Sequence, residues 1–393
     1  GAVLMAAVFI GYSVYSQPSA EEKAAAARQD SIENVARKNA ENAAKLAAQQ
    51  KVAQAQAAAK ADTTALFHSA LKGKATNVVL KNSSVELTLN TKGGVVSKAV
   101  IKNFTDYNGN SNVTLFDSSS QSLNFALAAK EVNINTSDLY FTPSNQTDST
   151  VTMTATAGDG KELVINYVLG SDYMLHAKLQ TVGMANDFAP SASQMDVQWK
   201  EMCRQQERGF TFENRYASLT YHKVDGGTDY LSEAKSITDE NIEKKIDWVA
   251  FKNQFFSAVM IAKNNFAENS LMTSVPQEKG SGNLKQYEAK MKTFFDPSGK
   301  TPSEFDFYFG PNDFRLLKRV EAESTFGKDL EMQRLVYLGW PLFRIINRWF
   351  TIYVFDFLTG LNINMGIVLI LITMLLKFIT YPMVKKSYMS SAK

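Results

Sequence analysis

The stretch VELTLNTKGGVVSKAVI, residues 85–101, decides the class of the fold. In its first part, Val85–Leu89, apolar and polar residues alternate, and a second apolar run ends at Ile101. Between the two parts lie Gly93 and Gly94, which allow the chain to turn sharply. A period of two places successive side chains on opposite faces of a sheet. The stretch therefore predicts two antiparallel strands with one buried face.

The same pattern returns further along the chain. Val151–Thr156 and Leu163–Val168 are two such runs on either side of a glycine-rich turn, and Asp225–Gly227 marks another turn. Short runs of this kind, separated by Gly, Asn and Asp turns, are typical of an antiparallel β-sandwich. We therefore predict a mainly β domain over residues 75–326, which is large enough to be held by its own core.

Two further segments of this domain predict a buried strand region and a closing helix. The aromatic run Trp248–Met260 predicts a buried central strand region. Its aromatic side chains are expected in the core rather than in a ligand site. The segment Phe314–Val320 predicts a helix that closes the domain.

The composition excludes several classes of function. With 42 basic and 39 acidic residues the net charge is +3, which gives no indication of nucleic-acid binding. The sequence has no P-loop, no Gly-rich dinucleotide turn and no Cys/His cluster with metal-ligand spacing. Cys203 is the only cysteine, so an internal disulfide is impossible. The histidines His68, His176 and His222 are far apart and are expected to be surface or hydrogen-bonded residues. We predict no catalytic residue, no metal and no cofactor.

The beginning of the sequence predicts a membrane attachment. Residues 1–16 are almost entirely apolar, and we expect them to be the truncated end of a first transmembrane segment. The alternative, a cleaved signal peptide, lacks a basic first region and a clean cleavage site here. Residues 17–74 are rich in Ala, Glu, Lys and Gln but poor in large apolar residues, so they cannot bury a core. They predict a helical or disordered tether.

Residues 327–360 predict an amphipathic helix region at the membrane surface. Pro341 suits the first turn of a helix, and the residues after it place apolar and basic side chains on different faces. This arrangement is typical of a helix in the lipid headgroup region. The alternative is an ordinary amphipathic helix that docks on the domain. The side chains expected at the membrane interface are Trp340, Phe343, Arg344, Arg348 and Trp349.

Residues 361–384 form an apolar run that is long enough to cross a bilayer core of about 30 Å, and they predict a second transmembrane helix. Lys377 is the charged residue inside it, at a cost of about 2.5–3.5 kcal/mol. Either its long stem lifts the ammonium toward the headgroups, or the charge faces a partner or a water-filled cavity. Lys385 and Lys386 mark the start of a cytoplasmic loop, residues 385–393, so the β domain is expected to face outward.

Taken in order, these segments resemble the YidC/Oxa/Alb family of membrane protein insertases in its Gram-negative form: anchor, large β domain, interfacial helix and second span. The resemblance covers most of the chain apart from the Ala-rich tether. The stretches that carry it are Leu87–Gly94, Trp248–Ala250, Gln254–Phe256, Tyr308–Pro311, Gly339–Phe343, Gly366–Thr373, Lys377, Tyr381–Pro382 and Ser387–Lys393.

The resemblance implies a multi-pass protein of the bacterial inner membrane with a periplasmic β-supersandwich domain. It implies that the protein helps nascent inner-membrane proteins to insert and fold, alone or with the Sec translocon and its accessory subunits, without nucleotide hydrolysis. The ribosome is a candidate partner through cytoplasmic parts beyond this sequence. In the family, the span that matches residues 361–384 carries a basic residue facing a hydrophilic groove, and Lys377 stands at that position. Bacterial members usually have Arg there, and Lys keeps the charge but lacks the planar donor fork.

Two other classes of function stay open. A membrane-tethered periplasmic protein that binds or processes carbohydrate is one, because the supersandwich also occurs in sugar-processing proteins. Such chemistry needs a carboxylate pair or a His/Glu pair in one cleft. His176 and His222 are the candidate histidines in the predicted domain, and no flanking motif supports either of them. A passive scaffold that only docks partners is the other. We expect no enzymatic activity.

Overall fold

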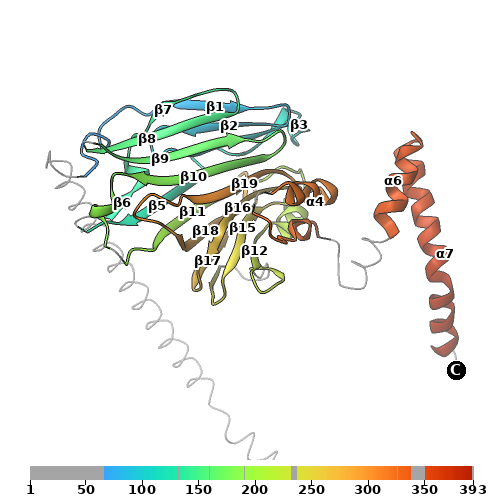
Figure 1. Cartoon of the computed structure of the whole chain (residues 1–393). Helices are drawn as coiled ribbons and strands as arrows, with labels where there is room; N and C mark the ends of the chain where they lie inside the picture. Colours follow the sequence, from blue (N-terminus) through green and yellow to red (C-terminus); the bar gives the residue numbers. More distant parts are fainter. Residues whose placement is uncertain are drawn as a thin grey trace, which may run out of the picture. The chain divides into compact units, whose positions relative to one another are not determined.

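The computed structural model describes residues 66–130, 133–158, 160–189, 191–231, 237–324, 326–337 and 350–391 (Figure 1). Contacts divide the chain into two compact units, Gly1–Lys72 and Gly73–Lys393. In the first unit, residues 66–71 form turns. The predicted first transmembrane segment, 1–16, and all but the end of the predicted tether, 17–74, lie outside the described residues.

A small antiparallel sheet contains the stretch 85–101. Gly93 and Gly94 both adopt positive φ in the turn between its second and third strands. A Cβ on Gly94 would lie 2.9 Å from the ring of Phe141. Position 94 therefore requires glycine both for its positive φ and for this close approach. The described strands of this sheet, in spatial order, are β1 (Asn77–Lys81), β2 (Val85–Asn90), β3 (Val95–Thr105) and β4 (Ser111–Phe116).

A second, larger antiparallel sheet takes up most of the other described strands. Its main path runs β6-β5-β11-β18-β16-β19-β10-β9-β8-β7, and β12 to β15 and β17 branch from this path. The bounds are β5 (Gln121–Ala128), β6 (Asn133–Asn135), β7 (Thr142–Ser144), β8 (Thr150–Gly158), β9 (Lys161–Leu169), β10 (Met174–Val182), β11 (Gln194–Arg204), β12 (Ser218–Lys223), β13 (Thr228–Tyr230), β14 (Thr238–Ile242), β15 (Ile246–Lys252), β16 (Phe256–Phe266), β17 (Ser270–Pro276), β18 (Asn283–Phe294) and β19 (Ser303–Pro311). Short 3₁₀ turns, η1 (Thr136–Asp138) and η2 (Ala185–Asp187), lie between strands.

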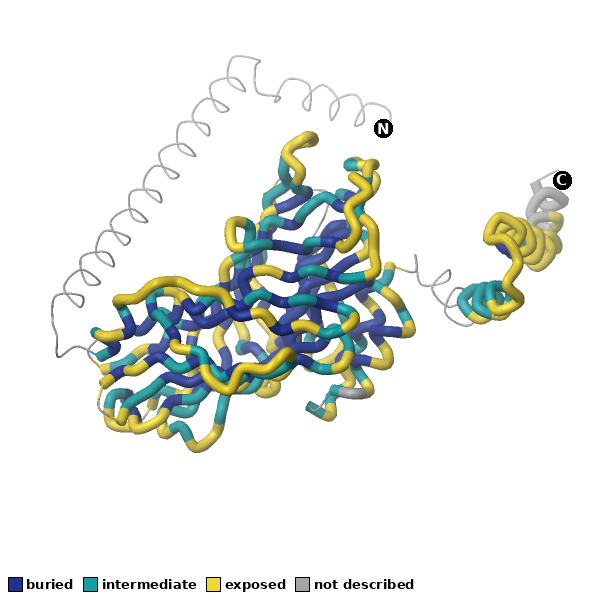
Figure 2. Tube along the Cα trace, turned by 90° about the horizontal axis from the view of Figure 1, so that it is seen from above, coloured by how far each residue is buried: buried dark blue, intermediate teal, exposed yellow. Residues whose placement is uncertain are grey.

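The large sheet curls so that its strands bury one another. Phe251 on β15 stacks on Trp199 of β11, with ring centroids 4.0 Å apart. The small sheet packs on the large one, where the rings of Phe116 and Phe309 meet edge to face at 5.5 Å. The buried parts of the trace therefore concentrate between the layers (Figure 2). The predicted antiparallel β-sandwich is confirmed.

The aromatic run Trp248–Met260, which lacks alternation, begins in strand β15. Every residue from Ile246 to Lys252 is buried, because both faces of this strand are covered. Phe251 points to the interior of the curled sheet, whereas Trp248 and Ala250 belong to a core cluster on the other face. The predicted buried central strand region is confirmed as β15 and β16.

Helix α4 (Phe314–Glu323) closes that second core cluster, as predicted from Phe314–Val320. Asp313 caps the helix, because its carboxylate accepts a hydrogen bond of 2.7 Å from the amide of Leu316. The chain then passes through η3 (Met332–Leu335). The indole of Trp248 donates a 2.7 Å hydrogen bond to the carbonyl of Leu330, and residues up to Leu335 are part of the same core. The segment after α4 thus packs on the core of the sandwich as far as Leu335.

The C-terminal part contains two helices, α6 (Ile352–Gly360) and α7 (Met365–Ser391). Asn364 begins α7, since its side chain accepts a 2.8 Å hydrogen bond from the amide of Gly366. Pro382 lies inside α7, and the helix continues through most of the predicted loop 385–393. Proline removes one backbone donor, and the helix nevertheless continues beyond it. Residues Met365–Pro382 are long and apolar enough to cross a membrane.

Candidate functional site

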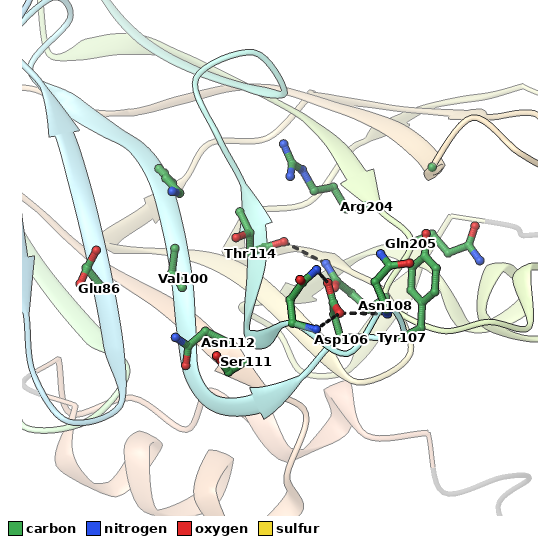
Figure 3. A pocket seen from close by; sticks show the side chains of 14 residues that line it. Glu86, Val100, Asp106, Tyr107, Asn108, Ser111, Asn112, Thr114, Arg204 and Gln205 are labelled. Carbon is green, nitrogen blue, oxygen red and sulfur yellow. Dashed lines mark hydrogen bonds between the residues drawn. The ribbon is translucent and has the colours of Figure 1, made fainter.

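A polar hollow lies between the β3–β4 hairpin and the end of β11 (Figure 3). Its volume is about 570 Å³, and amide side chains dominate its lining. The lining residues are Glu86, Lys98, Val100, Asp106, Tyr107, Asn108, Asn110, Ser111, Asn112, Thr114, Arg204, Gln205, Gln206 and Gly282.

The hairpin side of the hollow is built by Asp106. Its carboxylate accepts hydrogen bonds of 2.9 Å from the backbone amides of Asn108 and Asn110, and a third from the Asn110 side chain. The side-chain hydrogen bond from Asn110 lowers the pKa of Asp106, and the backbone amides add to this effect. Asp106 therefore shapes the turn, and its acceptor capacity is largely used within the protein.

The other side of the hollow is fixed by residues at the end of β11 and directly after it. The guanidinium of Arg204 pairs with the carboxylate of Asp117. The side chain of Gln206 donates a 2.9 Å hydrogen bond to the carbonyl of Thr114 on β4. This bond ties the segment after β11 to the small sheet, so the hollow has two fixed walls.

The carboxylate of Glu213 holds the segment that follows β11 through hydrogen bonds. It lies on α3 (Phe210–Tyr216), is fully buried, and accepts hydrogen bonds of 3.0–3.1 Å from the backbone amides of Gln206 and Glu207. Burial raises the pKa of Glu213 to about 7, although the hydrogen bonds from the two backbone amides act in the opposite direction. The carboxyl therefore titrates near neutral pH beneath the wall of the hollow.

We expect Glu213 to make stability depend on pH. Its pKa is about 7 in the folded state and 4.5 ordinarily, so between these values the folded state holds a proton that the unfolded state releases. The free energy of unfolding contributed by this group is therefore highest below pH 4.5 and falls as the pH rises toward 7. In Glu213→Gln this fall should be absent. Urea unfolding of both proteins across this interval tests it, and parallel pH profiles would contradict the assignment.

The lining of the hollow is rich in groups that can form hydrogen bonds. It offers amide and hydroxyl donors and acceptors, one aromatic ring, the cations of Lys98 and Arg204, and the carboxylate of Glu86. The other carboxylate of the lining, that of Asp106, is used in its own turn. Among the described residues, no group of three or more His, Cys, Asp or Glu side chains could hold a metal ion.

The two histidines of the sandwich pair with carboxylates elsewhere. His176 on β10 contacts Asp306 on β19 at 2.5 Å, and this hydrogen bond raises the pKa of His176. His222 on β12 is buried and contacts Asp247 on β15 at 3.1 Å. Neither pair lines the hollow. Their partners lie 130 and 25 residues away in sequence, so no flanking motif could reveal them.

Lys377 lies on α7 and is exposed. Val368 and Ile372, on the same helix, are buried in the pair formed with α6. At roughly 100° per residue, Lys377 is turned about 180° away from Val368. Thr373 and Thr380 lie on the same side as Lys377 and return their hydroxyls to backbone carbonyls one turn earlier.

The other predicted site residues lie either outside the described residues or further along α7. Trp340, Phe343, Arg344, Arg348 and Trp349 lie outside the described residues. Lys385 is an exposed residue of α7, and Lys386 follows it in the same helix. The polar hollow was not predicted. Its sequence signal is the run Asp106–Asn112, which is rich in turn-forming residues. Only the pairing of β3 with β4, and the packing of β4 against β11, bring this run next to Arg204.

Known sequences and known structures resemble this chain to different degrees. Residues 77–353 match the family described as the YidC periplasmic domain. Proteins named membrane protein insertase YidC from Phocaeicola vulgatus and Bacteroides fragilis are 47% and 40% identical over 100% of this chain, and the matches cover 63% of each relative. The chain thus spans less than two thirds of these relatives. A galactose mutarotase-like protein from Lactobacillus casei aligns over 60% of this chain and 100% of its own, at 10% identity and a TM-score of 0.39. That likeness is too weak to support an argument.

Proposed function

The chain belongs to the family of the YidC periplasmic domain, and from that membership we propose that it is part of an insertase that helps inner-membrane proteins to insert and fold. The observation that carries the proposal is the 47% identity to an insertase over the whole chain. The match extends beyond the β-sandwich and includes α7 with Lys377. The proposed location is the bacterial inner membrane, with several spans in the complete protein and the sandwich in the periplasm.

We propose that Lys377 acts as a point charge in a hydrophilic groove. A charge in a membrane span is retained against a cost of about 2.5–3.5 kcal/mol, which favours a function for it. It lies on the side of α7 opposite Val368, next to two threonines. A cation there attracts acidic or polar groups of a nascent chain and shortens the apolar distance that these groups must cross. The apolar part of the substrate then passes into lipid without nucleotide hydrolysis or a cofactor.

The proposed orientation follows from the ends of this span. Lys385 and Lys386 would lie on the cytoplasmic side, in keeping with the distribution of basic residues in membrane proteins. Trp340, Arg344 and neighbouring residues would lie at the periplasmic interface. Nascent inner-membrane proteins are the proposed substrates, and the Sec translocon with its accessory subunits, and the ribosome, are proposed partners of the complete protein.

A carbohydrate-active function gains no specific support. The pairs His176–Asp306 and His222–Asp247 lie on separate strand pairs, and neither reaches the polar hollow. Acid–base chemistry on a sugar needs its groups in one cleft. We therefore propose a non-enzymatic role, in which the sandwich supports insertion and binds partners.

A chimera tests the proposed function. This chain would be joined to the part of the Phocaeicola vulgatus insertase that it does not match, and produced in cells depleted of their own insertase. We expect restored growth and restored insertion of small single-span membrane proteins, scored by protease protection of their translocated tails. The control is the unmatched part of the relative produced alone. A chimera that reaches normal membrane levels but leaves insertion as low as in the control would refute the proposal.

A further inference from the structure

Three aromatic side chains form an exposed cluster at one edge of the sandwich. Phe212 on α3 and Tyr337, just after η3, are 54% and 55% exposed. Tyr216 lies between them, with its ring centroid 5.2 Å from that of Phe212 and 5.6 Å from that of Tyr337. We call these three residues the aromatic face. Large aromatic side chains that gather in contact with solvent indicate an interaction surface.

A further aromatic residue lies at the same end of the sheet. Ser218, which begins β12 directly after α3, pairs with Lys252 at the end of β15. The turn that follows β15 carries Phe255, which is 46% exposed. The aromatic face and this turn are therefore adjacent in the sheet, at one end of β12 and β15.

Helix α3, which carries Phe212 and Tyr216 of the aromatic face, is held firmly. Buried Lys252 donates a 2.9 Å hydrogen bond from its ammonium to the carbonyl of Tyr216, and buried Lys285 donates to the carbonyl of Ala217. These cations satisfy backbone acceptors at the C-terminal end of the helix, where its dipole is negative. Glu213 fixes the inner side of the same helix through Gln206 and Glu207. The fold thus presents Phe212 and Tyr216 from a rigid support.

The charges around the aromatic face are mainly basic. Arg215 is exposed on α3, three residues after Phe212. Arg208 is exposed two residues before the helix begins, and its guanidinium Nε donates a 3.4 Å hydrogen bond to the carbonyl of Tyr107. Arg334 is exposed on η3 and pairs with Glu331 at 2.7 Å. Glu207 is the neighbouring half-buried carboxylate. Tyrosine is enriched at the headgroup level of membranes, and arginine forms strong hydrogen bonds with phosphate.

The course of the chain indicates which surface the aromatic face meets. Tyr337 is the last described residue of the sandwich before the segment that leads to α6 and α7. Helix α7 contains the membrane-spanning candidate Met365–Pro382. The chain therefore leaves the sandwich at the aromatic face, so this edge is the one that the chain joins to the candidate span.

We propose that the aromatic face, Phe212, Tyr216 and Tyr337, rests on the headgroups of the periplasmic leaflet, with Arg208 and Arg215 on lipid phosphates. The sandwich is then docked on the membrane surface and does not hang from a free linker. This inference depends on the proposed membrane location but not on insertase activity.

Site-directed fluorescence quenching in lipid nanodiscs tests this docking. The full chain would carry a dye at Phe212→Cys, with discs of phosphatidylcholine and phosphatidylglycerol that contain lipid with a spin-labelled headgroup. Cys203 is buried, so the introduced cysteine is the one that reacts. The matched control is Val182→Cys, which is 42% exposed at the far end of β10. Val182 and the turn with Phe255 lie near opposite ends of β19. Val182 comes after Leu179, which pairs with Ser303 at the start of β19, whereas Phe256 pairs with Pro311 at its end.

We expect severalfold stronger quenching of the dye at position 212 than at position 182. Adding Arg208→Gln and Arg215→Gln should weaken the quenching at 212, and more so in discs with phosphatidylglycerol than in discs of phosphatidylcholine alone. Equal, weak quenching at both positions would overturn the proposal. So would a dye at 212 that is shielded from a water-soluble quencher but not reached by the lipid quencher, because another protein copy would then cover the face. Chain that fails to copurify with the discs would refute the membrane location itself.

Discussion

Lys377→Glu in the chimera should reduce insertion of a small membrane protein with an acidic translocated tail by about tenfold or more. Two unit charges about 6 Å apart interact by roughly 3 kcal/mol at an effective dielectric constant of about 20. Reversing the charge turns this attraction into repulsion, and each 1.36 kcal/mol in a barrier is about a tenfold change in rate. Lys377→Ala removes the attraction without adding repulsion, so its defect should be smaller than that of Lys377→Glu. Protease protection of the tail during synthesis measures both.

Two further variants decide what the lysine does. Lys377→Arg should support insertion at close to the original rate, because a point-charge role needs the charge and not the shape of the donor group. Lys385→Ala is the matched control, since it removes a cation from the same helix outside the apolar span. If Lys377→Ala inserts the substrate as well as the original protein does, Lys377 is a snorkelling residue. Insertion would then depend on the apolar walls of the groove.

The sandwich could be predicted from the sequence because its signals are local. Alternation in Val85–Leu89 and the turn at Gly93 and Gly94 are visible within a few residues, and the structure places them in β2 and the turn before β3. The run around Trp248 lacks alternation because β15 is covered on both faces, which still indicates burial. In each case the residues that form the strand or turn are the same few residues that carry the sequence pattern.

The polar hollow and the aromatic face could not be predicted, because each is made by segments far apart in the chain. Arg204 meets the turn at Asp106 only after β3, β4 and β11 have found their partners. Tyr337 meets Tyr216 only because the segment after α4 folds back on the core. Residue type alone gives Phe212 no mark that separates it from the buried phenylalanines.

The segment that follows α4 packs in one core cluster with Trp248. Trp248→Ala should lower the free energy of unfolding by about 3–5 kcal/mol, the range found when a large buried aromatic is truncated. Trp248 is fully buried against α4 and η3, and its indole also donates to the carbonyl of Leu330. Because a domain is stable by only about 5–15 kcal/mol, this loss is a large share of the total. Urea unfolding of the full chain, followed by tyrosine and tryptophan fluorescence, measures it.

Trp248→Phe separates packing from the attachment of the segment that leads to the membrane. Phenylalanine keeps most of the apolar volume but leaves the Leu330 carbonyl without its donor, at a cost of about 1–3 kcal/mol. We expect this variant to open the segment 326–337 to protease before the sandwich unfolds, whereas exposed Val224→Ala should leave both unchanged. Equal cleavage rates in the original protein and in Trp248→Phe would show that Leu330 is held by packing alone. A segment released in this way would also carry Tyr337 away from Tyr216, so the aromatic face would lose its third member without any change at Phe212.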